Sequence, residues 1–88
     1  MFATISNWEF DEAFTDETRA TAQGILPMLT KAGALNAYMV ETSDTHATVV
    51  TLWPDAETAA AVEKARGAAK EEGGTILSKS AGKVAAHV

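Results

Sequence analysis

The chain has 88 residues, a net charge of −5 at neutral pH and no cysteine. This length predicts one domain over residues 1–88, and the negative charge argues against nucleic acid or an anionic membrane as a partner. The lack of cysteine excludes disulfides and thiolate metal sites; with no membrane-spanning apolar run and no signal-peptide pattern, we expect a cytoplasmic protein.

Residues 2–8 are predicted to form the first strand. Their side chains alternate between two faces, and each face carries a large apolar group, such as Ile5 or Trp8. Asn7 is unusual here, because asparagine is depleted in strands. The simplest interpretation is that Asn7 ends the strand and begins a turn. Phe10 and Phe14 follow, four residues apart, as on one helical turn.

A first helix is predicted to begin at Asp11 or Thr15 and to end near Ala32. Pro27 lies inside this pattern and removes one backbone hydrogen bond, so we expect a kink near it and not two helices. Gly33 suits the left-handed position that follows a helix. The apolar stripe repeats at a period near 3.6 residues and consists of Phe14, Thr18, Ala22 or Thr21, Ile25 and Leu29.

A β-hairpin and a second helix follow. Residues 35–42 and 46–53 alternate as strands do, and the short polar segment 43–45 between them predicts an antiparallel turn. Asp55 is then placed to cap a helix over residues 56–72. The inner stripe of this helix is small-sided and consists of Ala59, Val62, Ala65 or Arg66, and Ala69.

The last segment, residues 75–88, should contain a fourth strand. The alternation of Val84, Ala86 and Val88 favours a strand over residues 82–88. Residues 75–77 are interpreted either as the entry to this strand or as one more turn of helix.

The order of elements is therefore β-α-β-β-α-β. This order is typical of the ferredoxin-like α+β fold, in which a four-stranded antiparallel sheet carries both helices on one face. The other face would then be open, yet the strands carry apolar side chains at both parities. An apolar open face needs a cover, and a second copy of the chain is the simplest one. We therefore predict a homodimer closed through this face.

Two short segments resemble the dimeric α+β-barrel superfamily. They are Leu26-Pro27-x-Leu29-x-x-x-Gly33, which closes the first helix, and Leu52-Trp53-x-x-x-x-Thr58-Ala59, which joins the third strand to the second helix. The superfamily includes antibiotic-biosynthesis-type and haem-degrading monooxygenases. The resemblance implies that two sheets close into a barrel across a dimer and that ligands bind between each sheet and its helices.

The resemblance also bears on cofactors. Haem-degrading members have an Asn late in the first strand and a Trp at the end of the third, similar to Asn7 and Trp53. They bind iron through a His on the second helix, about ten residues past that Trp, because imidazole is the usual proximal ligand. Here that position is Glu63, and helix two has no His. We therefore predict no haem, no metal and no other cofactor.

The candidate ligand-binding residues are Asn7, Tyr38, Trp53 and His46, with Trp8 and Met39 as further walls of a pocket. By resemblance, a cofactor-independent monooxygenase would use Asn7 to bind a substrate oxygen and His46 or His87 to accept a proton. The alternative is that the aromatic residues fill the core or the dimer interface.

Three functions remain open at this point. The first is a homodimer that binds a small apolar or aromatic ligand in the cleft. The second is a cofactor-independent monooxygenase acting on an aromatic substrate. The third is a structural or regulatory dimer without a small-molecule site. Whether the protein is an enzyme stays open, since superfamily membership does not confer chemistry.

Overall fold

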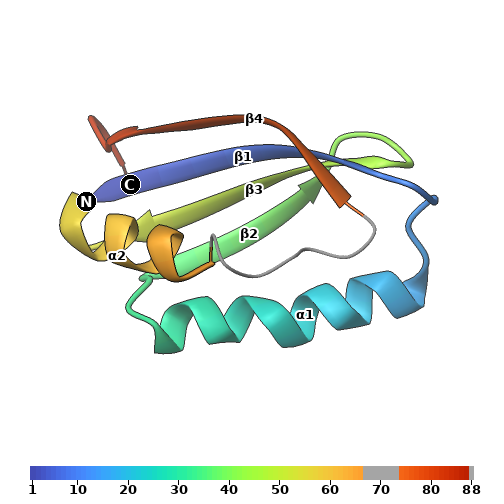
Figure 1. Ribbon diagram of the computed structural model, residues 1–88, viewed down its shortest axis with the longest axis horizontal. Helices are drawn as coiled ribbons and strands as arrows, with labels where there is room; N and C mark the ends of the chain where they lie inside the picture. The colour runs from blue at the N-terminus through green and yellow to red at the C-terminus, as the bar shows by residue number, and fades with distance from the viewer. Residues whose placement is uncertain (67–73, 88) are drawn as a thin grey trace.

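The computed structural model describes residues 1–66 and 74–87 and has the predicted β-α-β-β-α-β order (Figure 1). The elements are β1 (Phe2–Phe10), α1 (Asp16–Lys31), β2 (Asn36–Glu41), β3 (His46–Trp53), α2 (Ala56–Arg66) and β4 (Gly74–Lys83). The strands form one antiparallel sheet in the order β2-β3-β1-β4. Both helices lie on the same side of this sheet (Figure 1). The ferredoxin-like α+β fold is confirmed.

Strand β1 is longer than predicted, because Asn7 does not end it. Asn7 pairs with Thr48 of β3 and Ser78 of β4, and the strand continues to Phe10. The Asn7 side chain accepts a hydrogen bond from Thr48 Oγ1 at 2.6 Å and donates one to Ser78 Oγ at 2.9 Å. These cross-strand bonds satisfy the amide, so an asparagine is tolerated in the middle of the sheet.

Helix α1 begins with a capping box at Thr15, one of the two predicted caps. The Thr18 backbone N–H donates to Thr15 Oγ1 at 3.2 Å, and the Thr15 backbone N–H donates to Thr18 Oγ1 at 2.7 Å. The helix is continuous through Pro27, which confirms one helix in place of two, whereas the kink expected near residues 23–27 stays a prediction. Gly33 follows the helix at a φ of 121°. That backbone conformation favours glycine, because it has no Cβ.

The inward stripe of α1 differs from the predicted one. Leu29 is buried and Leu26 packs beside it, whereas Ile25 is 51% exposed. The side of the helix that packs on the sheet carries Leu26 and Leu29, and Ile25 points away from the sheet. Phe14 precedes the helix and meets Phe10, at the end of β1, with ring centroids 5.2 Å apart. The predicted helical turn joining the two phenylalanines was wrong.

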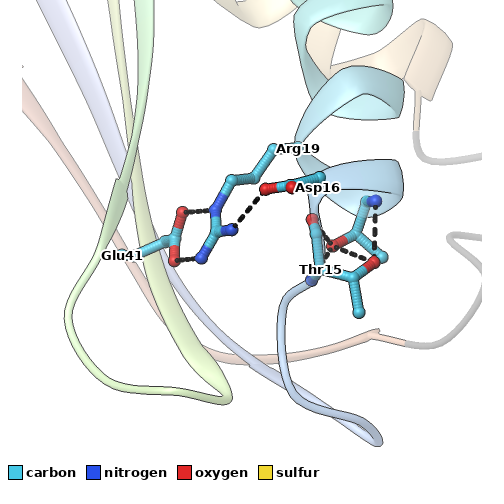
Figure 2. Close-up of polar contacts among 5 residues, drawn as sticks. Thr15, Asp16, Arg19 and Glu41 are labelled. Carbon is cyan, nitrogen blue, oxygen red and sulfur yellow. Dashed lines mark hydrogen bonds and ion pairs between the residues drawn. The ribbon is translucent and has the colours of Figure 1, made fainter.

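An ion pair fastens the start of α1 to the end of β2 (Figure 2). The Arg19 guanidinium donates to both carboxylate oxygens of Glu41, at 2.8 and 2.9 Å, and to Asp16 at 3.1 Å. The bonds from Arg19 hold the pKa of Glu41 below its ordinary value, and those to Glu41 raise the pKa of Arg19. A bidentate Arg–carboxylate pair of this kind fixes the relative orientation of the two side chains as well as their distance.

We expect the Glu41→Gln variant to melt at a lower temperature than the native protein at neutral pH. Because the pKa of Glu41 is lower in the folded chain than in the unfolded chain, its contribution is present above the unfolded value and is lost as pH falls through the folded one. The difference between the two melting temperatures should therefore shrink as the pH falls below about 4.3, the ordinary value of a Glu side chain. Glu12→Gln, at an exposed site without a described side-chain contact, is the control and should change little. Curves that stay parallel at all pH values would contradict the argument.

The hairpin and the start of α2 follow the prediction closely. β3 spans the predicted residues, and the Thr58 backbone N–H donates to Asp55 Oδ1 at 2.7 Å, which caps α2. This bond holds the pKa of Asp55 below its ordinary value. Residues 67–72 of the predicted helix lie outside the described part of the chain.

The fourth strand was predicted in the wrong place. β4 spans Gly74–Lys83, and residues 84–87 are not in a strand. β4 lies at the edge of the sheet, and nine of its ten residues are exposed, so no apolar alternation marks it. Its position is set by pairing with β1, from Phe10 opposite Gly74 to Phe2 opposite Lys83. Of the two alternatives for residues 75–77, the strand is confirmed.

The core lies between the sheet and the helices. It contains Leu29, Ala34, Trp53 and Ala59, and Phe2, Leu26, Ala37 and Val62 pack around it. α1 packs against β2, whereas α2 packs against β1 and β3. Among the described residues, no helix has the length and apolar character needed to cross a membrane.

Candidate functional site

A cleft opens between α2 and the part of the sheet formed by β3, β1 and β4; we call it the α2 cleft. Its volume is about 720 Å³. This volume lies within the range of small-molecule sites, which are mostly apolar with a few polar groups. Its apolar lining includes Phe2, Trp8, Val49, Trp53, Val62 and Ile76.

The small side chains of α2 explain why the cleft is there. Ala59 is buried next to Trp53, so the helix approaches the sheet closely at that point. Ala56 and Ala60 also line the cleft, and their methyl groups fill little of it. α1 packs on β2 and leaves this part of the sheet to α2.

Two indole rings are held in the cleft by neighbouring hydroxyl groups. Trp53 Nε1 donates to Thr4 Oγ1 at 3.0 Å. Trp8 Nε1 donates to Ser6 Oγ at 2.8 Å, and the Trp8 ring stacks on Phe10 with centroids 6.1 Å apart. Buried indole nitrogens need such acceptors, and these bonds fix the orientation of both rings.

One ion pair links α2 to β4 at the cleft. Lys79 Nζ lies 2.6 Å from Glu63 Oε1, and each side chain is about half exposed. Both residues line the cleft, and they are the charged residues in its described lining. Their charges balance, so the described lining is close to neutral as a whole.

The four predicted ligand-binding residues do not form one site. Trp53 is 3% exposed and faces the helices, where it lines the α2 cleft. Trp53 pairs with Phe2, so the two side chains share a face of the sheet. Side chains alternate along a strand, so Asn7, an odd number of residues after Phe2 on β1, lies on the opposite face. We call that side the open face.

Tyr38 and His46 also lie away from the α2 cleft. Tyr38 is on edge strand β2, is 51% exposed and lines a separate groove between α1 and β2, which Met39 lines as well. His46 begins β3 opposite Glu9, and its Nε2 lies 3.1 Å from Glu9 Oε2. His87 follows β4 and lines neither groove. Of the predicted pocket residues, Trp8 and Trp53 are brought together.

His46 is part of a chain of polar contacts with Ser43 and Glu9. Ser43 Oγ lies 2.9 Å from His46 Nδ1, and the opposite ring nitrogen contacts Glu9. These contacts join a hydroxyl, an imidazole and a carboxylate in the order found in a Ser-His-Asp catalytic triad. However, Ser43 Oγ already accepts hydrogen bonds from the backbone N–H groups of Thr45 and His46, and it lies in an exposed turn outside both grooves. The contacts therefore stabilise the hairpin turn.

Sequence reasoning did not assign the polar residues of the α2 cleft to a site. They are Thr4, Ser6, Thr51, Glu63, Lys79 and Ser80. Thr4 and Ser6 point to the same face of β1 as Trp8, because side chains alternate along a strand. This alternation is the signal that could have assigned them to the same cleft as Trp8. Small hydroxyl side chains carry no motif of their own. Lys79 lies on the strand that the apolar pattern had misplaced.

Comparisons with models of protein families, with curated proteins and with solved structures found no match to this chain. Within residues 1–66 and 74–87, no group of three or more histidine and acidic side chains is placed to hold a metal ion. The function is therefore inferred from the geometry of the cleft and of the open face.

Proposed function

We propose that the protein is a homodimer that binds a small, mainly apolar or aromatic molecule in the α2 cleft. The observation that carries the proposal is a cleft of about 720 Å³ lined by large apolar side chains with few polar groups. Apolar side chains that face water raise the free energy of the protein. A ligand that covers them removes this apolar area from water, and its binding is favourable in proportion to that area.

The dimer is supported by the apolar side chains on the open face. Among them, Ile5 is 36% exposed, Tyr38 51% and Val40 49%. A contiguous apolar face of this kind favours a partner that covers it. The apolar residues of the open face lie on β1, β2 and β3 and are Ala3, Ile5, Tyr38, Val40, Val50 and Leu52.

A cleft-filling variant tests the ligand site. Ala60 lines the cleft, whereas its neighbour Ala61 is exposed on α2 and does not. Phenylnaphthylamine, a neutral apolar dye, should raise the melting temperature of the native protein, because a ligand that binds the folded state stabilises it. Ala60→Phe should weaken this binding about tenfold by occupying the cleft, and Ala61→Phe should leave it unchanged. Equal binding by both variants would contradict the proposal.

The alternative of cofactor-free oxidation needs a proton acceptor beside the substrate. Asn7 and His46 lie outside the α2 cleft, and the carboxylate in its described lining, that of Glu63, is paired with Lys79. No specific contact favours this alternative. Oxygen uptake with a hydroxylated polycyclic aromatic, lost in Ala60→Phe and kept in Ala61→Phe, would favour the enzyme over the binding protein.

A further inference from the structure

The polar groups on the floor of the α2 cleft are arranged as hydrogen-bond donors. A hydroxyl group has one hydrogen to donate and two lone pairs that accept. Thr4 Oγ1 accepts from the Trp53 indole, and Ser6 Oγ accepts from the Trp8 indole. Neither hydroxyl donates to another described side chain, and both line the cleft. Each hydroxyl hydrogen is therefore available to an oxygen on a ligand.

A lysine lies opposite one of these hydroxyl residues across the sheet. Ser6 and Lys79 are cross-strand partners in the pairing of β1 with β4, and both line the cleft. Directly opposite residues in an antiparallel sheet have neighbouring side chains on the same face. The Lys79 ammonium has three hydrogens, and Glu63 Oε1 is its described partner, at 2.6 Å. The ammonium can therefore donate to a second acceptor at the same place.

We propose that the ligand of the α2 cleft is an organic anion: an apolar or aromatic body with an acidic oxygen group that binds between Ser6 and Lys79. The apolar body would lie against Trp8 and Val62, and the anionic group would accept hydrogen bonds from the Ser6 hydroxyl and the Lys79 ammonium. This inference rests on the proposed function, because it specifies the ligand of the same cleft. Hydrogen bonds to charged groups are the stronger kind, so the acidic group would add selectivity.

Glu63 has a defined part in this arrangement. In the ligand-free protein its carboxylate neutralises Lys79, and the two side chains join α2 to β4. An anionic ligand must share the ammonium with this carboxylate and is repelled by it. Removing the charge of Glu63 should therefore strengthen the binding of anions, whereas removing the charge of Lys79 should weaken it.

Two dyes with the same ring system test the inference. Anilinonaphthalene sulfonate carries an anionic group, and phenylnaphthylamine is its neutral counterpart. Titrations followed by dye fluorescence should give about fivefold weaker sulfonate binding in Lys79→Met and about threefold tighter binding in Glu63→Gln, as expected for partly exposed charges. The neutral dye should bind both variants as it binds the native protein. Lys83→Met, on the same strand but outside the described lining of the cleft, is the matched control for lost charge.

The outcomes separate the two proposals. If neither dye binds, or if Ala60→Phe leaves the binding of both dyes unchanged, the ligand site itself is wrong. If both dyes bind in the cleft but Lys79→Met and Glu63→Gln bind the sulfonate with the same affinity as the native protein, the ligand site stands and its preference for anions is wrong. If Lys83→Met weakens sulfonate binding as much as Lys79→Met, the effect belongs to the overall charge and the inference is overturned.

Discussion

Replacing Trp53 with alanine should lower the free energy of unfolding by about 3–5 kcal/mol, the usual cost of removing a buried tryptophan. Trp53 is 3% exposed and contacts the core formed with Leu29, Ala34 and Ala59. Two of the three other core residues are the alanines Ala34 and Ala59, whose side chains are too short to fill the cavity. A loss of this size approaches the whole stability of a small domain.

Urea unfolding followed by far-ultraviolet circular dichroism would measure the loss without relying on tryptophan emission. Trp53→Phe is the matched control. It keeps an aromatic ring in the core but removes the indole N–H that donates to Thr4 Oγ1. We expect its destabilisation to be less than half that of Trp53→Ala. A loss below about 1 kcal/mol in Trp53→Ala would mean that the core is not centred on this residue.

Val50→Lys should convert the proposed dimer to a folded monomer. Val50 lies on the open face between Tyr38 of β2 and Ile5 of β1, in the middle of the apolar residues. In a monomer the lysine would extend into water and cost little. In a closed dimer it would be an unpaired buried charge, which costs about 3 kcal/mol or more, or over a hundredfold in the dissociation constant.

Sedimentation equilibrium would follow the change, with the native protein at twice the 9.2 kDa chain mass and the variant at the chain mass. Ala20→Lys adds the same charge at an exposed site on α1, on the other side of the sheet, and should leave the dimer intact. If the native chain is a stably folded monomer at micromolar concentration, the dimer is ruled out and the open face faces water.

The element order could be predicted from the sequence because each turn and cap has a local signal. Thr15 and Asp55 cap the two helices through side-chain oxygens; Asp55 was predicted outright, and Thr15 was one of two candidates. Gly33 follows α1 for an equally local reason. These features depend on a few adjacent residues, and one sequence is enough to show them.

The edge strand and the site could not be predicted in the same way. β4 is placed by its pairing with β1, and its exposed residues need not alternate. The grouping of the site residues depends on register, because Asn7 and Trp53 reach the same face only if their strands pair differently. The asparagine also looked like a turn residue, since its partners Thr48 and Ser78 are far away in the sequence.

The two borders of the sheet also limit how copies of the chain can join. β4 pairs with β1 on one side, and it carries Lys79 and Lys83 and a change of register opposite Asn7 and Trp8. β2, at the other border, is six residues long and ends at Glu41, which is tied to Arg19. Lysines, irregular pairing and short length all discourage a further strand from docking. In the proposed dimer, self-association would therefore use the open face, which would give closed pairs, and not strand-by-strand growth into fibres.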